Sequence, residues 1–207
     1  MSAPSRIADM LQTADRPLAE QPSVTDAHLL RDNRELSMEV ARLRLRVAEL
    51  ERMADTDPML DVYNRRAFMR EVRRAQNVMG RYAIASSVIF LDLDGFKAVN
   101  DRYGHGIGDE VLSRVADVLR RGVRDCDMVA RLGGDEFGVL LFKGGLDVAR
   151  AKAGVLSCRI GQVSLPHPDG AVRVTASWGV APCEPGDTPE AVLDRADRAM
   201  YLDKARV

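Results

Sequence analysis

Two adjacent carboxylates, Asp135 and Glu136, directly follow two glycines, Gly133 and Gly134. Apolar runs precede and follow this group, so the glycines are expected at the tip of a β-hairpin. Glycines have no Cβ and let a polyanion approach the main chain closely, whereas two carboxylates repel a bare phosphate. The combination predicts a divalent metal ion between the acids and a phosphate-bearing ligand.

A second pair of acids ends an apolar run. Residues 87–93 are rich in apolar and β-branched side chains and predict a buried strand, with Asp92 and Asp94 on one face of it. Such a strand delivers Asp92 to the rim of a sheet, where Mg²⁺ can be bound with water and phosphate completing its shell. Any one of these acids alone is compatible with an ordinary turn residue. Turn chemistry does not, however, require an acid at the end of an apolar strand.

These residues carry a resemblance to a known family. Segment 131–137 resembles the signature of the GGDEF diguanylate cyclases, and segment 90–109 resembles the family's second block residue for residue. The similarity covers residues 55–207. It implies an α/β fold with a mixed β-sheet flanked by helices, like the palm of nucleotide cyclases and polymerases. It also implies an enzyme that condenses two GTP molecules into cyclic di-GMP.

The resemblance assigns the metal and the chemistry to particular residues. The metal-binding positions, for Mg²⁺ or Mn²⁺, are Asp92, the carbonyl of Leu93, Asp135 and Glu136. Asp135 is also implied to help deprotonate the attacking 3′-hydroxyl, and Lys97 to neutralise charge in the transition state. The reaction is an in-line attack on an α-phosphorus with pyrophosphate leaving. Paired metal ions about 3.5–4 Å apart stabilise the entering and leaving oxygens of such a displacement.

The resemblance also implies a guanine site. Asn100 and Asp109 match the guanine-recognising positions, and their chemistry agrees. An Asp accepts hydrogen bonds from N1 and N2 of guanine, a donor pair that adenine lacks, and an Asn amide both donates and accepts. The other substrate-binding positions that the resemblance implies are Phe96, Gly133, Gly134 and Lys204.

A short pattern before the glycines points to feedback. Arg124 and Asp127 lie three apart, and Arg124 precedes Gly133 by nine residues, which resembles the family's inhibitory product-binding motif. The planar donors of Arg suit a guanine edge or a phosphate. The alternative is that Arg120, Arg121 and Arg124 are cations at a helix C-terminus. The position relative to the glycines favours the product site.

Two segments depart from the family pattern. Its members usually read Asp, any residue, Leu, Thr, Gly, Leu, but residues 57–62 read DPMLDV, so Leu60 and Asp61 replace the Thr and the Gly. Those positions support a loop beside the nucleotide site, whose order is therefore open. After Lys204 the usual Gly-Arg is absent, so a phosphate-binding arginine is missing or is replaced by Arg206.

The N-terminal part shows a seven-residue repeat. Leucines recur every seven residues, and Asn33 and two valines recur in the complementary phase, which predicts a parallel two-stranded coiled coil. Asn33 would fix its register. Two interchain pairs, Glu39 with Arg44 and Arg46 with Glu51, are attractive, but each contributes only about 0.2–1 kcal/mol. The alternative is a lone amphipathic helix packed on its own domain, which usually has a wider apolar stripe. The repeating apolar residues are Leu29, Leu36, Val40, Leu43, Val47 and Leu50.

Dimerisation follows from the implied reaction as well. The product has two-fold symmetry and one subunit holds one GTP, so two subunits must face each other as a homodimer. A coiled coil raises the effective concentration of one half-site near the other. We therefore expect a flexible segment over 1–25, a coiled-coil helix over 26–54 and a cyclase domain over 55–207.

The composition limits the possible binding partners and the cellular location of the protein. A net charge of −1 gives no basic surface for nucleic acid, and no apolar run approaches the ~20 residues that span a bilayer. The N-terminus lacks the pattern of a secretion signal. Cys126, Cys158 and Cys183 form no CxxC motif and are odd in number, which indicates reduced thiols and a cytoplasmic protein.

Periodicity predicts the remaining elements. Helices are expected over 65–78, 108–121, 146–160 and 189–204, and a strand over 172–180. Two other functions compete with the active cyclase: an inactive receptor for GTP or cyclic di-GMP, and a coiled-coil scaffold. The presence of all the acids favours the cyclase, because an inactive receptor would normally have lost one of them.

Overall fold

The computed structural model describes residues 24–168 and 170–204, and the chain divides into two units between Leu50 and Glu51. Helix α1 (Val24–Asp55) contains the seven-residue repeat. The segment predicted to be flexible lies outside the described residues except for 24 and 25, which are the first residues of α1. No helix among the described residues combines the length and the apolar character needed to cross a membrane. The repeating residues of α1 are all exposed: Leu29, Leu36, Val40, Leu43, Val47 and Leu50.

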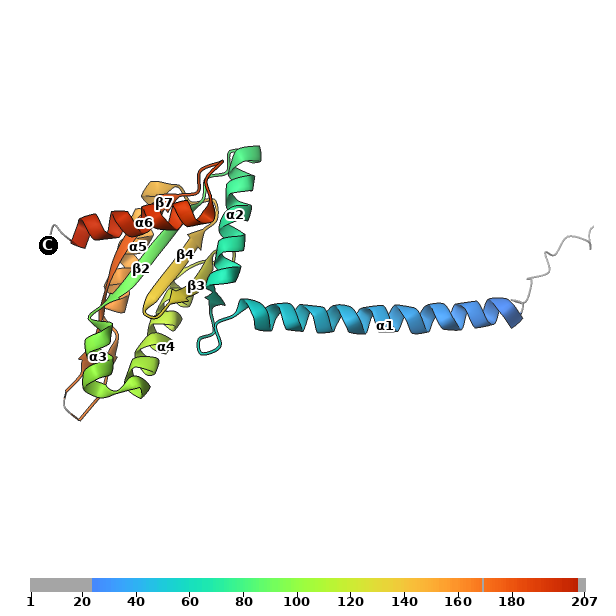
Figure 1. The fold of residues 1–207 in the computed structure, drawn as a ribbon, viewed down its shortest axis with the longest axis horizontal. Coiled ribbons are helices and arrows are strands. Elements are labelled where there is room, and N and C mark those ends of the chain that lie inside the picture. Colours follow the sequence, from blue (N-terminus) through green and yellow to red (C-terminus); the bar gives the residue numbers. More distant parts are fainter. Residues whose placement is uncertain (1–23, 169, 205–207) are drawn as a thin grey trace, which may run out of the picture. The chain divides into compact units, whose positions relative to one another are not determined.

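The second unit is built on a five-stranded sheet in the order β1–β3–β4–β2–β7 (Figure 1). The strands are β1 (Tyr63–Asn64), β2 (Ser87–Asp94), β3 (Met128–Gly133), β4 (Glu136–Leu141) and β7 (Thr175–Pro182). The pair β1 and β3 is parallel, whereas the other neighbours are antiparallel. The predicted mixed sheet and the hairpin at the two glycines are therefore confirmed.

Helices cover both faces of this sheet. One buried cluster joins α4 (His105–Gly122) and α5 (Leu146–Ile160) to the sheet, and the other joins α2 (Arg65–Tyr82) and α6 (Pro189–Lys204) to it. Strand β2 supplies Ile89 and Leu91 to the first cluster and Val88 and Phe90 to the second. Because β2 is buried on both faces, its sequence is a continuous apolar run rather than an alternating one.

One helix was missed, and one expected strand needs correction. The helix α3 (Phe96–Tyr103) was not predicted; it begins after Gly95, whose φ of 69° turns the chain out of β2. The strand expected over 172–180 is split into β6 (Val172–Arg173) and β7, and β6 pairs with β5 (Ser164–Leu165) in a separate small sheet. The helices expected over 146–160 and 189–204 are confirmed as α5 and α6.

Candidate functional site

The predicted metal-binding residues meet where β2 and the β3–β4 hairpin end. Antiparallel pairing places Asp92 of β2 opposite Glu136 of β4. The backbone N–H of Leu93 donates to the carbonyl oxygen of Asp135 at 3.3 Å, which holds the hairpin tip against the end of β2. The Glu136 carboxylate lies beside Gly133, since its Oε2 is 3.6 Å from the point where a Cβ would stand. Two chain segments thus bring all four positions together.

Negative charges gather in this cluster. Burial raises the pKa of Glu136 above its ordinary value of 4.5, and the negative charges of Asp92 and Asp135 raise it further, while Arg65 opposes them. Neighbouring carboxylates with only oxygen ligands fit a hard divalent cation such as Mg²⁺. Among the described residues no group of three His, Cys, Asp or Glu side chains is placed to hold a metal ion by itself, so a backbone carbonyl, water and phosphate oxygens would have to contribute ligands.

Asp94 has a different role from Asp92. Its two carboxylate oxygens accept hydrogen bonds of 2.7 Å from the hydroxyls of Thr175 and Ser177 on β7. These contacts fasten the end of β2 to β7 immediately after Leu93, whose carbonyl is a predicted metal ligand. Asp94 is therefore a positioning residue that the sequence did not separate from Asp92.

The predicted guanine-binding residues lie on α3 and α4. Phe96 is buried, and Asn100 lies against Gly108 so closely that a Cβ there would overlap the Asn100 Oδ1. Asp109, the next residue of α4, is exposed. The packing of α3 on α4 thus gathers the three predicted residues from two helices.

The two predicted phosphate-binding lysines differ in how far the structure describes them. Lys97 is exposed in the first turn of α3. Lys204 is the last residue of α6, and its side chain lies outside the described residues.

Arg131 connects the hairpin tip to the loop that follows α1. The Nε of Arg131 donates to the carbonyl oxygen of Gly134 at 2.9 Å, and its Nη1 lies 3.6 Å from Oδ1 of Asp57. The same oxygen of Asp57 accepts hydrogen bonds from the backbone N–H groups of Met59 and Leu60, both at 2.9 Å. The loop that departs from the family pattern is therefore ordered by Asp57, although it lacks the usual Thr and Gly.

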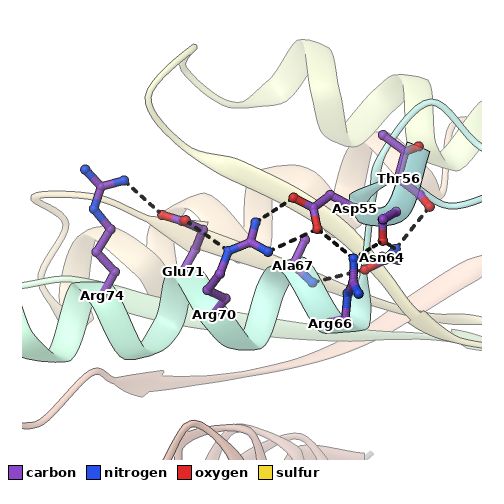
Figure 2. Close-up of polar contacts among 9 residues, drawn as sticks. Asp55, Thr56, Asn64, Arg66, Ala67, Arg70, Glu71 and Arg74 are labelled. Atoms are coloured by element: carbon purple, nitrogen blue, oxygen red, sulfur yellow. Dashed lines mark hydrogen bonds and ion pairs between the residues drawn. The ribbon is translucent and has the colours of Figure 1, made fainter. Parts of the chain in front are cut away.

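A polar network surrounds the start of α2 (Figure 2). The Asp55 carboxylate accepts hydrogen bonds from Arg70 at 2.7 and 3.0 Å and from Arg66 at 3.2 Å. Asn64 caps α2 by accepting from the backbone N–H of Ala67, and its amide donates to carbonyl oxygens of the chain that precedes the loop. The hydrogen bond from Arg70 holds the pKa of Asp55 below its ordinary value.

The predicted inhibitory motif borders a cavity of about 610 Å³. The Asp127 carboxylate accepts hydrogen bonds of 3.1 Å from the backbone N–H groups of Arg124 and Phe142, so it shapes the turn that carries Arg124. The arginines at the end of α4, Arg120 and Arg121, line the same cavity. Arg120 and Arg121 thus lie at the end of a helix and also line the cavity that Arg124 and Asp127 border.

Comparison with known proteins agrees with this geometry. The chain matches the family described as "Diguanylate cyclase, GGDEF domain" over residues 54–207. It is 38% identical over 174 residues to the diguanylate cyclase TpbB of Pseudomonas aeruginosa (strain UCBPP-PA14), which covers 82% of this chain and 40% of that protein. It is 40% identical over 118 residues to the diguanylate cyclase DgcZ of Escherichia coli (strain K12), covering 56% of this chain and 40% of that protein. The chain thus spans about 40% of the length of these curated relatives.

The chain also resembles a solved structure in its three-dimensional fold. The coiled coil and GGDEF domain of DgcB from Caulobacter crescentus, in complex with c-di-GMP, superimposes with a TM-score of 0.75 at 29% identity. The match covers 86% of this chain and 94% of that one. The chain therefore belongs to the GGDEF family of diguanylate cyclases.

Proposed function

We propose that this chain condenses two GTP molecules into cyclic di-GMP and releases pyrophosphate. The observation that carries the proposal is the meeting of Asp92, Asp135 and Glu136 where β2 ends and the β3–β4 hairpin turns. The curated relatives named as diguanylate cyclases support it.

A divalent metal ion belongs to this proposal. Asp92, the Leu93 carbonyl, Asp135 and Glu136 would hold Mg²⁺ or Mn²⁺, and the raised pKa of Glu136 supports a cation at this place. When bound, such an ion stabilises the negative charge that develops on the entering and leaving oxygens.

The chain's own residues position and protonate the reactants. Asp135, beside the metal-binding oxygens, accepts the proton of the attacking 3′-hydroxyl. The hairpin tip at Gly133 and Gly134 exposes main chain without side chains, so phosphates can approach it closely. Lys97 in the first turn of α3 offers its ammonium group to the phosphates, and Lys204 serves the triphosphate from the end of α6.

Residues of α3 and α4 recognise the guanine base. Asp109 accepts the N1 and N2 hydrogens of guanine, and the Asn100 amide both donates to and accepts from the same base. The Asn100 side chain lies directly against Gly108, and the ring of Phe96 lies near the same glycine, so this packing restricts the movement of Asn100. A rigid Asn100 favours GTP over ATP, because adenine leaves these polar groups without partners.

We further propose that the enzyme is a homodimer formed through a parallel coiled coil. The seam leucines of α1 are between 49% and 66% exposed in the single chain, which is costly unless a second helix covers them. Each subunit then contributes one GTP to a two-fold symmetric product. GTP is a cytoplasmic substrate, so we place the enzyme in the cytoplasm.

Product inhibition completes the proposal. Arg124 and Asp127 border the cavity of about 610 Å³, which lies outside the metal-binding cluster and offers three guanidinium groups to an anionic nucleotide. Cyclic di-GMP carries two phosphates and two guanines, which planar Arg donors suit.

One experiment tests the catalytic proposal. Purified full-length chain is incubated with GTP and Mg²⁺, and cyclic di-GMP and pyrophosphate are quantified. We expect product from GTP but not from ATP, and a loss of about 100-fold or more for Asp135→Asn. The matched control is Glu190→Gln, an exposed acid in the first turn of α6, which should keep its activity. GTP binding without turnover would instead support an inactive receptor.

A further inference from the structure

The cavity beside Arg124 contains an acid that the family pattern does not have. Asp61 stands at the usual glycine position of the loop and lines the cavity. Its Oδ2 lies 2.7 Å from Nη1 of Arg120 at the end of α4. Arg120 is thus already paired with a carboxylate from a different part of the chain.

The surroundings of Asp61 keep this pair in place. The loop before it is held by the hydrogen bonds that Asp57 accepts, and the residues on either side of Asp61, Leu60 and Val62, are both buried. Asp61 itself is 82% exposed. These contacts hold the backbone at Asp61 in place, so its carboxylate stays at the cavity wall. The other acid near Arg120, Asp117, is more distant, at 3.9 Å.

An anion that enters this cavity meets two obstacles. It must replace Asp61 as the partner of Arg120, and it must tolerate the negative charge of Asp61, which stays close by. Exposed ion pairs are weak, so the pair with Asp61 can be exchanged, but the exchange lowers the affinity for the incoming phosphate.

We propose that Asp61 competes with the product for Arg120. By pairing with Arg120 in the product-binding cavity, the Asp61 carboxylate weakens the binding of a nucleotide with two phosphates. The inference rests on the proposed function, because the ligand is the product of that function, cyclic di-GMP. A chain with glycine at this position would be inhibited at a lower product concentration.

Direct binding of cyclic di-GMP to the full-length chain, measured by calorimetry, tests the inference. Asp61→Asn keeps the size of the side chain and removes its charge, and we expect it to bind about two- to five-fold more tightly than the wild type. Asp61→Gly should change the affinity in the same direction. Arg120→Ala should bind more weakly, and the effect of Asp61→Asn should disappear in the Arg120→Ala background.

Asp125 offers a matched control, since it lines the same cavity and no ion pair to Arg120 is found for it within the described residues. Asp125→Asn removes one negative charge without freeing Arg120, so its effect should be smaller. If Asp125→Asn and Asp61→Asn tighten binding equally, or if the Asp61 effect persists without Arg120, competition for Arg120 is refuted.

These variants distinguish failure of this inference from failure of the proposed inhibitory site. Loss of binding in Arg124→Ala together with an unchanged affinity in Asp61→Asn would overturn the inference and leave the site intact. Unchanged binding in Arg124→Ala, or no binding to either the wild type or Asp61→Asn, would overturn both.

Discussion

The Arg131 side chain donates a hydrogen bond of 2.9 Å to the carbonyl oxygen of Gly134, across the turn that it precedes. Gly134 has a φ of 40°, a left-handed conformation that glycine adopts without steric cost. The second anchor of Arg131 is Asp57, at the start of the loop after α1. The position of Asp135 and Glu136 at the hairpin tip therefore depends on a side chain that contacts a distant loop.

Replacing Arg131 tests this dependence. Arg131→Ala should lower kcat by about 10- to 100-fold, because small displacements of catalytic groups are costly. It should lower the free energy of unfolding by about 1.5–3 kcal/mol, the usual contribution of a hydrogen bond that involves a charged group. The measurements are steady-state turnover of GTP and urea unfolding. A variant with normal kcat would show that the turn holds the acids without Arg131.

Gly108 provides a test of the guanine site. Gly108→Ala places a Cβ where Asn100 Oδ1 now lies, so Asn100 must move away from its position. We expect the KM for GTP to rise about tenfold, since a lost buried hydrogen bond costs about 1–3 kcal/mol, with a smaller change in kcat. Gly106→Ala in the same helix is the control, because nothing lies within 4 Å of its added Cβ. Equal KM values for the two variants would contradict the assignment of Asn100.

The acids of the site could be predicted from sequence because their placement follows from local rules. A strand that ends in an acid and a hairpin that turns at glycines both fix where side chains emerge, and antiparallel pairing then brings Asp92 and Glu136 together. The alternation of side chains along β2 could not reveal that Asp94 accepts hydrogen bonds from β7. Its partners, Thr175 and Ser177, lie far away in the chain.

Other features depend on contacts that no local pattern encodes. The eight-residue helix α3 is too short to be stable alone and relies on burying Phe96 and Val99 in the core. The pairs Arg131 with Asp57 and Arg120 with Asp61 join loops to distant elements. The acids at the end of β2 and at the hairpin could therefore be placed from local patterns, whereas the pairs that involve Asp57 and Asp61 could not.

The coiled coil can be tested with two variants of the same helix. Leu36 and Leu43 are seam leucines, so Leu36→Asp with Leu43→Asp should make the protein monomeric and abolish activity at low protein concentration. Leu45 lies outside the seven-residue repeat and is 74% exposed, so Leu45→Asp should leave the dimer intact. Sedimentation and turnover over a dilution series measure both properties. A doubly substituted protein that stays dimeric and active would exclude the seam as the dimer contact.

The ion pairs of Asp55 predict a dependence of stability on pH. Because the hydrogen bond from Arg70 lowers the pKa of Asp55 below 3.8, the folded state favours the ionised carboxylate. The resulting stability is fully present above pH 3.8 and is lost as the pH falls through the folded-state pKa. Asp55→Asn should therefore lower the free energy of unfolding by about 1 kcal/mol at neutral pH, as expected for two partly exposed pairs.

The acid range distinguishes this effect from lost packing. Urea unfolding between pH 7 and pH 3 should show the difference between the wild type and Asp55→Asn shrinking as the carboxylate becomes protonated. Glu110→Gln, which breaks an exposed pair with Arg114 on α4, should cost no more than about 0.5 kcal/mol. The carboxyl carbon of Asp55, followed by NMR, should titrate below 3.8 in the folded protein and move towards that value in Arg70→Ala. A stability difference that stays constant down to the lowest pH would assign the effect of Asp55 to packing rather than to its charge.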